Sequence, residues 1–243
     1  MFRVAPLAWL ALVFGYWMAM TVISFIPFVG VVVASVLVPA LSVGFMAASR
    51  AAEKRLPVEL ANLGAGFRNH ALAQIALGTV YFAAIAALLA ATALADDGTL
   101  ARWMSTGQRP SPDALASDAF VRALLVSAVL YVPVMMAFWF APVLVAWHGL
   151  SALKALFFSF FASLINWRAF LAYGAGAAIA LFVLPAVVAL CAMLLSAGQA
   201  RTLLLSVMFP FLLMLLPTLF ASFYASYRDV FGEREGPPAK QSD

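Results

Sequence analysis

The stretch ALFFSFFASLINWR (residues 155–168) decides the fold, because it determines how many times the chain crosses a membrane. It carries four phenylalanines within five positions and turns polar at Asn166. Its uninterrupted apolar part, residues 155–165, would form a helix about 16 Å long, or half of a hydrocarbon layer of about 30 Å. The preceding Lys154 has a stem long enough to lie along apolar surface while its ammonium group stays in water. Length alone therefore does not decide whether this segment crosses.

The composition of the whole chain implies a membrane. Of its 243 residues, 66% are hydrophobic and 10% are charged, against about 45–50% and about 25% in soluble domains. A soluble protein of this length could not bury so much apolar surface, so its solvent must be lipid. The net charge of +4 is spread between apolar blocks. That pattern suits anionic lipid headgroups and argues against nucleic acid.

Six apolar blocks have the roughly 20 residues that a transmembrane helix needs. They cover residues 6–26, 31–48, 71–94, 123–146, 169–195 and 202–224, and none carries Asp, Glu, Lys, Arg or His in its interior. The first block continues past Phe25 without a cleavage site of small residues, so we predict a retained span. Residues 1–232 are predicted to form one transmembrane domain, followed by a disordered polar tail, residues 233–243.

Positive charges decide whether residues 155–165 form a seventh span. With six spans and a cytoplasmic N-terminus, ten of the 14 Lys and Arg residues lie on the inner side and four on the outer side. If residues 155–165 also crossed, seven would lie on each side. Because cytoplasmic loops carry an excess of Lys and Arg, the six-span arrangement is favoured. We therefore predict that the segment does not cross and that both termini are cytoplasmic.

Small residues recur every four positions around this segment. The stripe consists of Ser151, Ala155, Ser159 and Ser163, with Asn166 following. A helix would place these residues on one small, weakly polar face and leave the phenylalanines on the remaining surface. We expect an interfacial or partly inserted helix whose stripe packs against a neighbouring span. The alternative is a plain cytoplasmic extension of the fourth span.

Residues 50–70 link the second and third spans on the same predicted inner side. Four apolar residues fall at helical spacing there, between charged ones: Leu56, Leu60, Leu63 and Phe67. This spacing predicts a second amphipathic segment. Each half of the chain then holds a span, an inner segment and a returning span, which suggests an internal duplication. The predicted fold is an all-α polytopic membrane protein with six transmembrane helices and two amphipathic segments on the cytoplasmic side.

The sequence offers little catalytic chemistry. Its two histidines, His70 and His148, stand at the inner ends of spans, without the three convergent ligands that a metal needs. A nucleophile elbow, a Walker loop and a dinucleotide fingerprint are all missing. We therefore predict no enzymatic activity, no cofactor and no metal site. The lack of charged residues inside the spans also argues against a proton-coupled carrier.

Cations on the inner side are the remaining functional candidates. They are Arg50, Lys54, Arg55, Arg68, Lys154 and Arg168. We predict that they gather at one membrane face, where each gains about 1 kcal/mol from an anionic leaflet; alternatively, they only set the orientation. The predicted function is a non-catalytic module that binds anionic lipids, a partner protein or a second copy of itself. The alternative is a small-solute or lipid transporter that uses proline-broken helices.

Four short patterns carry a family resemblance. They are Phe67-Arg68, Trp139-Phe140-Ala141-Pro142, Asn166-Trp167-Arg168 and Ala225-Ser226-Tyr227-Arg228-Asp229. Together they resemble an uncharacterised family of proteobacterial multi-pass inner-membrane proteins, similar in layout to the membrane domain of some glycerophosphoryl diester phosphodiesterases. The resemblance implies a bacterial inner-membrane location and six helices. It implies no phosphodiesterase activity, because the clustered acids and histidines of the catalytic domain are not found in this sequence.

Overall fold

The computed structural model describes residues 5–27, 29–195 and 200–232, and within these ranges every regular element is a helix. The chain forms two compact units, and each is described by itself. The first unit comprises Met1–Gly15, Phe45–Asn62 and Arg168–Asp243. The second comprises Tyr16–Gly44 and Leu63–Trp167.

Five helical stretches in the described ranges are long and apolar enough to cross a membrane. They are α1 (Pro6–Ser24), α2 (Gly30–Glu53), α4 (Ala71–Asp96), the consecutive helices α7 and α8 (Asp118–His148), and Trp167–Cys191. The last stretch joins α10 (Trp167–Ala178), a π-helical turn (Ile179–Val183) and α11 (Leu184–Leu195). These five stretches overlap the first five predicted spans. The predicted span 202–224 falls in α12 (Ala200–Phe231), where many side chains lie outside the described part, as does the predicted tail.

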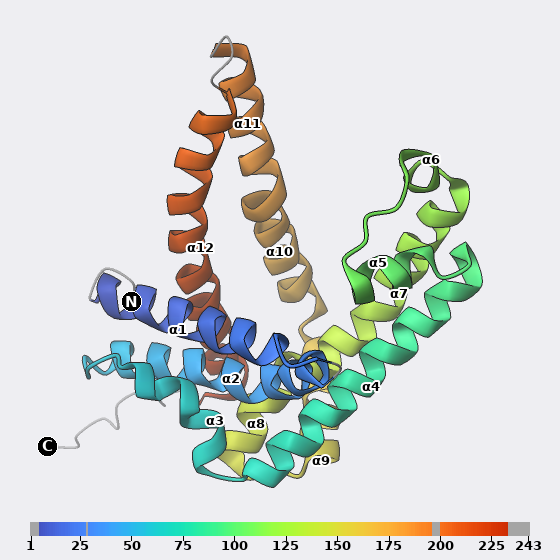
Figure 1. Cartoon of the computed structure of the whole chain (residues 1–243). Helices are drawn as coiled ribbons and strands as arrows, with labels where there is room; N and C mark the ends of the chain where they lie inside the picture. Colours follow the sequence, from blue (N-terminus) through green and yellow to red (C-terminus); the bar gives the residue numbers. More distant parts are fainter. Residues whose placement is uncertain (1–4, 28, 196–199, 233–243) are drawn as a thin grey trace, which may run out of the picture. The chain divides into compact units, whose positions relative to one another are not determined.

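In the first unit, α12 packs against the C-terminal half of α2 and against α10. The rings of Phe45 and Phe220 stack with centroids 3.8 Å apart. The hydroxyl groups of Tyr173 and Ser222 lie 3.0 Å apart and join α10 to α12. In Figure 1, α10 continues into α11, and α11 lies beside α12. Side-chain hydrogen bonds of this kind fasten helices in lipid, where the hydrophobic effect does not drive helix association.

In the second unit, α4 and α7 run side by side, and the short helices α5 (Thr99–Thr106) and α6 (Pro112–Leu115) cover one end of the pair (Figure 1). The buried carboxylate of Asp96 starts α5, because its oxygens accept from the backbone N–H groups of Gly98 and Leu100 at 3.1 and 2.7 Å. Leu100 packs with Phe120 and Ala123 of α7 in a small apolar cluster. This end lies between the predicted spans 71–94 and 123–146, on the predicted outer side.

The stretch that decides the fold forms α9 (Ala152–Ile165), a 14-residue helix. Its length of about 21 Å is shorter than the hydrocarbon layer. The turn around Gly149, which has φ +64°, separates α9 from α8 (Ala141–His148). Ser159 contacts Phe140 and Ser163 contacts Met136, so α9 runs back along α7 in the opposite direction. The alternative of a plain extension of the fourth span is therefore wrong.

The segment linking α2 to α4 differs from the predicted amphipathic helix. Instead of one helix over residues 50–70, it has an extended stretch, a 3₁₀ turn (Leu60–Gly64) and the single-turn helix α3 (Ala65–Arg68). Leu56 and Leu60 are about half exposed. Pro57 explains the interruption, because proline cannot donate a helical hydrogen bond and disfavours a helical residue before it. The helical spacing of the leucines was not sufficient to predict a helix.

Candidate functional site

The helix made by α7 (Asp118–Trp139) and α8 breaks at Phe140, and α9 supplies the groups that satisfy the break. In a regular helix the N–H of Phe140 would donate to the carbonyl of Met136. Here the Ser159 hydroxyl stands between them, accepting from the N–H of Phe140 and donating to Met136, both at 2.9 Å. The Ser163 hydroxyl donates to the same Met136 carbonyl at 3.2 Å. A side chain that inserts between the backbone groups of a helical hydrogen bond is an established cause of helix kinks. Proline is another, and Pro142 lies two residues after the break.

A second polar side chain reaches this break from α4. Gln74 is fully buried, and its Nε2 donates to the Pro142 carbonyl at 2.6 Å. Its Oε1 has no hydrogen-bond partner within the described ranges. Gln74 carries no charge, so the lack of charged residues inside the spans gave no indication of it. The available signal was an uncharged amide near the start of an apolar span, since polar groups inside membranes are costly and usually have a structural or functional role.

Glycines bring the N-terminal half of α2 into close contact with α3 and α4. A Cβ on Gly66 would lie 2.1 Å from the Ala40 carbonyl oxygen, and one on Gly78 would lie 1.9 Å from that of Val36. Val36 and Ala40 are one turn apart on α2, so both glycines meet the same face of that helix. Small residues of this kind allow helix backbones to approach closely in membranes.

The predicted small-residue stripe divides into a buried middle and two ends. Ala155, Ser159 and Ser163 are buried, and the two serines bind the α7 backbone. Ser151 is exposed. The Asn166 side chain donates to the carbonyl of Ala162 in its own helix at 2.8 Å. The stripe therefore fastens α9 to the break in α7–α8 through its three central residues.

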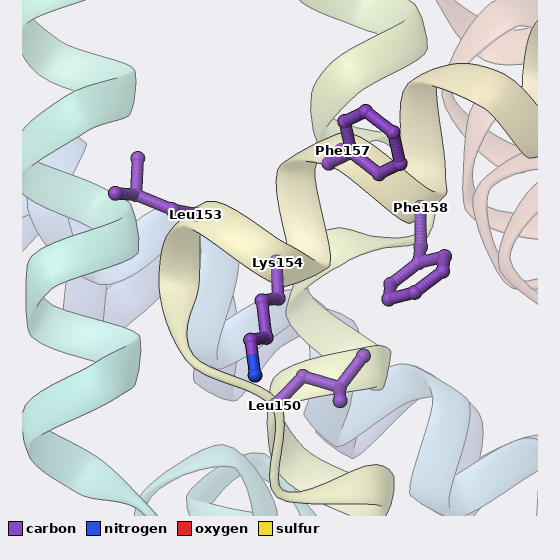
Figure 2. Close-up of a pocket in the computed structure, with 5 residues that line it drawn as sticks. All are labelled: Leu150, Leu153, Lys154, Phe157 and Phe158. Atoms are coloured by element: carbon purple, nitrogen blue, oxygen red, sulfur yellow. The ribbon is translucent and has the colours of Figure 1, made fainter.

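The opposite face of α9 borders an open cleft of about 420 Å³ (Figure 2). Its lining residues are Leu150, Leu153, Lys154, Phe157 and Phe158. Lys154 is the single charged residue of that lining. In Figure 2 the side chains of Lys154 and Phe158 extend from α9 toward the side where Leu150 lies. The cleft thus combines an apolar wall with one cationic group.

All six predicted basic contacts are exposed, and they divide between the two units. Arg50, Lys54, Arg55 and Arg168 belong to the first unit, and Arg68 and Lys154 to the second. The side chains of Lys54, Arg55 and Lys154 form no hydrogen bond or ion pair with any described residue. Within the described ranges, no acid is therefore paired with these three side chains.

The ends of α2 and α12 meet in a polar cluster within the first unit. The Glu53 carboxylate accepts from the Tyr224 hydroxyl at 2.6 Å and pairs with the Arg228 guanidinium. Burial raises the pKa of the Tyr227 phenol above its usual value, and the charge of Arg50 opposes this shift. Tyr227 is therefore neutral at physiological pH. This cluster could not be predicted from the sequence, because Glu53 is more than 170 positions away from Tyr224 and Arg228.

The two histidines lie at the turns that join the spans. His70, with φ +56°, faces Gly149, where an added Cβ would be 3.1 Å from the imidazole Nε2. His148 precedes that glycine at the end of α8. In the part of the chain that the structure describes, no three His, Cys, Asp or Glu residues come together as a group that could hold a metal ion.

Comparison with known proteins finds one informative relative. A "probable inner membrane protein" of Burkholderia thailandensis is 40% identical over 97% of this chain and 88% of its own length. Neither a protein-family model nor a solved structure matches the chain. The resemblance to the membrane domain of glycerophosphoryl diester phosphodiesterases therefore has no support from these comparisons.

Proposed function

The chain belongs to the family of this probable inner membrane protein, and from that premise we propose that it is a non-catalytic module that binds anionic lipid headgroups at the cytoplasmic face. Lys54, Arg55 and Lys154 carry the proposal, because they are exposed and unpaired within the described ranges. An unpaired Lys or Arg near an anionic leaflet gains about 1 kcal/mol. A partner protein with an acidic surface is the competing ligand for the same cations.

The proposal includes six spans with both termini in the cytoplasm. The cluster of Glu53, Tyr224 and Arg228 supports this topology, because it joins the end of α2 to the end of α12. Helix ends in direct contact lie on the same side of a bilayer, which requires an even number of crossings between them. The chain crosses four times between these two ends if α9 does not span, which satisfies the condition. If α9 also spanned, the number of crossings would be five and the two ends would lie on opposite sides.

Cysteine labelling tests the topology. In a Cys191→Ser background, Ser105→Cys is expected to react with a membrane-impermeant maleimide in intact cells, because residue 105 follows an outward-running span. Lys54→Cys and Asp243→Cys are expected to react only after the inner membrane is opened. Labelling of Asp243→Cys in intact cells would mean an odd number of crossings and would contradict the proposed arrangement.

Lipid retention tests the function. Lys54→Gln and Arg55→Gln are each expected to lower the affinity for phosphatidylglycerol by about fivefold, the equivalent of about 1 kcal/mol. The measurement is the amount of phosphatidylglycerol that the full chain binds in mixed detergent micelles, as the lipid is titrated at low and at high salt. Arg109→Gln is the matched control, because it removes the same charge from an exposed residue on the predicted outer side. An equal loss of phosphatidylglycerol affinity in all three variants would mean that only the net charge of the protein matters, which would contradict the proposed site. Unchanged affinity in Lys54→Gln and Arg55→Gln would refute the proposal.

Transport receives less support from the structure. The transporter alternative uses backbone carbonyls near Pro39 or Pro142 to line a path. The Pro39 carbonyl accepts from the Ser42 hydroxyl at 2.7 Å, and the Pro142 carbonyl accepts from Gln74. Both carbonyls are thus engaged inside the protein.

A further inference from the structure

The cleft beside α9 has a shape and a charge that fit one class of ligand. Its volume of about 420 Å³ falls in the range of about 300–1,000 Å³ that is common for small-molecule sites. Four of its five lining residues are leucine or phenylalanine, and the fifth is Lys154. An amphiphile with a hydrocarbon chain and one anionic group would match both parts of this lining.

The position of α9 explains why the cleft is open. Ser159 and Ser163 bind the α7 backbone, and within the described part of the chain the residues on the other side of α9 stay exposed. Leu153 is 75% exposed, Phe157 58% and Phe158 48%. Residues 154, 157 and 158 share one helical face, because they are three and four positions apart. The apolar wall and the cation therefore belong to a single surface.

Charge complementarity identifies the occupant further. Lys154 lies in the first turn of α9, where the partial positive charge of a helix N-terminus makes a cation unfavourable and an anion favourable. No acid among the described residues pairs with it. A phosphate at its Nζ would accept up to three hydrogen bonds from the ammonium group and offset this local excess of positive charge.

We propose that this cleft binds one anionic phospholipid of the surrounding bilayer. An acyl chain lies along Leu153, Phe157 and Phe158, and the phosphate contacts the Lys154 ammonium group. The inference rests on the proposed function and makes it specific, because it assigns one lipid to one place on α9. Lys54 and Arg55 lie outside the cleft and act on the leaflet by charge alone.

Photo-crosslinking of the full chain tests the site. The probe is phosphatidylglycerol with a diazirine on one acyl chain, compared with phosphatidylcholine carrying the same group, in vesicles of otherwise neutral lipid. Crosslinks from phosphatidylglycerol are expected within residues 150–158. Lys154→Gln is expected to lower their yield by about fivefold and to lower the phosphatidylcholine yield less, because the choline cation offsets the charge of the same phosphate. Lys154→Arg is expected to restore the yield, and Lys54→Gln, which removes a cation outside the cleft, to leave it unchanged.

The outcomes separate this site from the general proposal. Phosphatidylglycerol binding could depend on Lys54 and Arg55 while the crosslinks lie outside residues 150–158. In that case the cleft is not the lipid site, and the proposed function stands. If the wild-type chain shows no preference for phosphatidylglycerol, both fail. Crosslinks from these residues to a second copy of the chain or to another protein would also overturn the site. Loss of crosslinks in inorganic phosphate at constant ionic strength would show that the anion alone is recognised, and would overturn the acyl part.

Discussion

Replacing Gly78 with alanine is expected to lower the free energy of unfolding by about 3 kcal/mol, the largest effect we predict for a single methyl group. The added Cβ would lie 1.9 Å from the Val36 carbonyl oxygen, which is backbone and cannot rotate away. Helix α2 must therefore move off α4. The measurement is equilibrium unfolding of the full chain by sodium dodecyl sulfate in mixed micelles.

Gly176→Ala provides the matched control for Gly78→Ala. Gly176 is also in a helix, but a Cβ there would meet nothing within 4 Å among the described residues. Alanine has the higher helix propensity, by up to about 1 kcal/mol. The control is thus expected to be neutral or slightly stabilising. Equal destabilisation by both substitutions would mean that the α2–α4 contact is not the cause.

Ser159→Ala is expected to lower the free energy of unfolding by about 2 kcal/mol, because the buried N–H of Phe140 loses its acceptor. The hydroxyl of Ser159 is the group to which this N–H donates, at 2.9 Å. The same detergent titration measures the loss. A second readout is amide hydrogen exchange at Phe140, which should become faster in the variant, since local opening then breaks one hydrogen bond fewer.

Ser163→Ala separates this effect from the loss of any interhelical hydroxyl. Ser163 donates to the Met136 carbonyl, which still accepts from Ser159 when Ser163 is changed. Its removal leaves no buried donor without a partner, and the expected cost is about 0.6 kcal/mol, typical of hydrogen bonds between membrane helices. Equal costs for the two serines would argue against an inserted hydroxyl at the break.

The apolar spans could be predicted because they depend on local sequence. A run of about 20 apolar residues has few alternatives to a helix in lipid, so the first five predicted spans overlap the five helical stretches of sufficient length. The joint at residues 50–70 was predicted less well. Its leucines have helical spacing, but Pro57 interrupts the backbone, and this local effect outweighed the pattern.

Contacts between helices could not be predicted from the sequence. Gly78 and Gly176 are both glycines in apolar runs, and only at Gly78 does a neighbouring backbone leave no space for a Cβ. The sequence placed Ser159 on a stripe of small residues. Its hydrogen bond to the N–H of Phe140 could not be predicted, because that bond depends on where the chain turns back before α9. The lining of the cleft likewise combines the turn before α9 with one face of that helix. Each of these features depends on how separate elements pack.

The serine that completes the break in α7–α8 also has a consequence for biogenesis. Ser159 follows Phe140 by 19 positions, so it leaves the ribosome after the fourth span. Until it arrives, the N–H of Phe140 has the Met136 carbonyl as its acceptor, as in a regular helix. The fourth span is therefore expected to enter the membrane as an unbroken helix. The break at Phe140 then forms when α9 folds back and its hydroxyl replaces that bond.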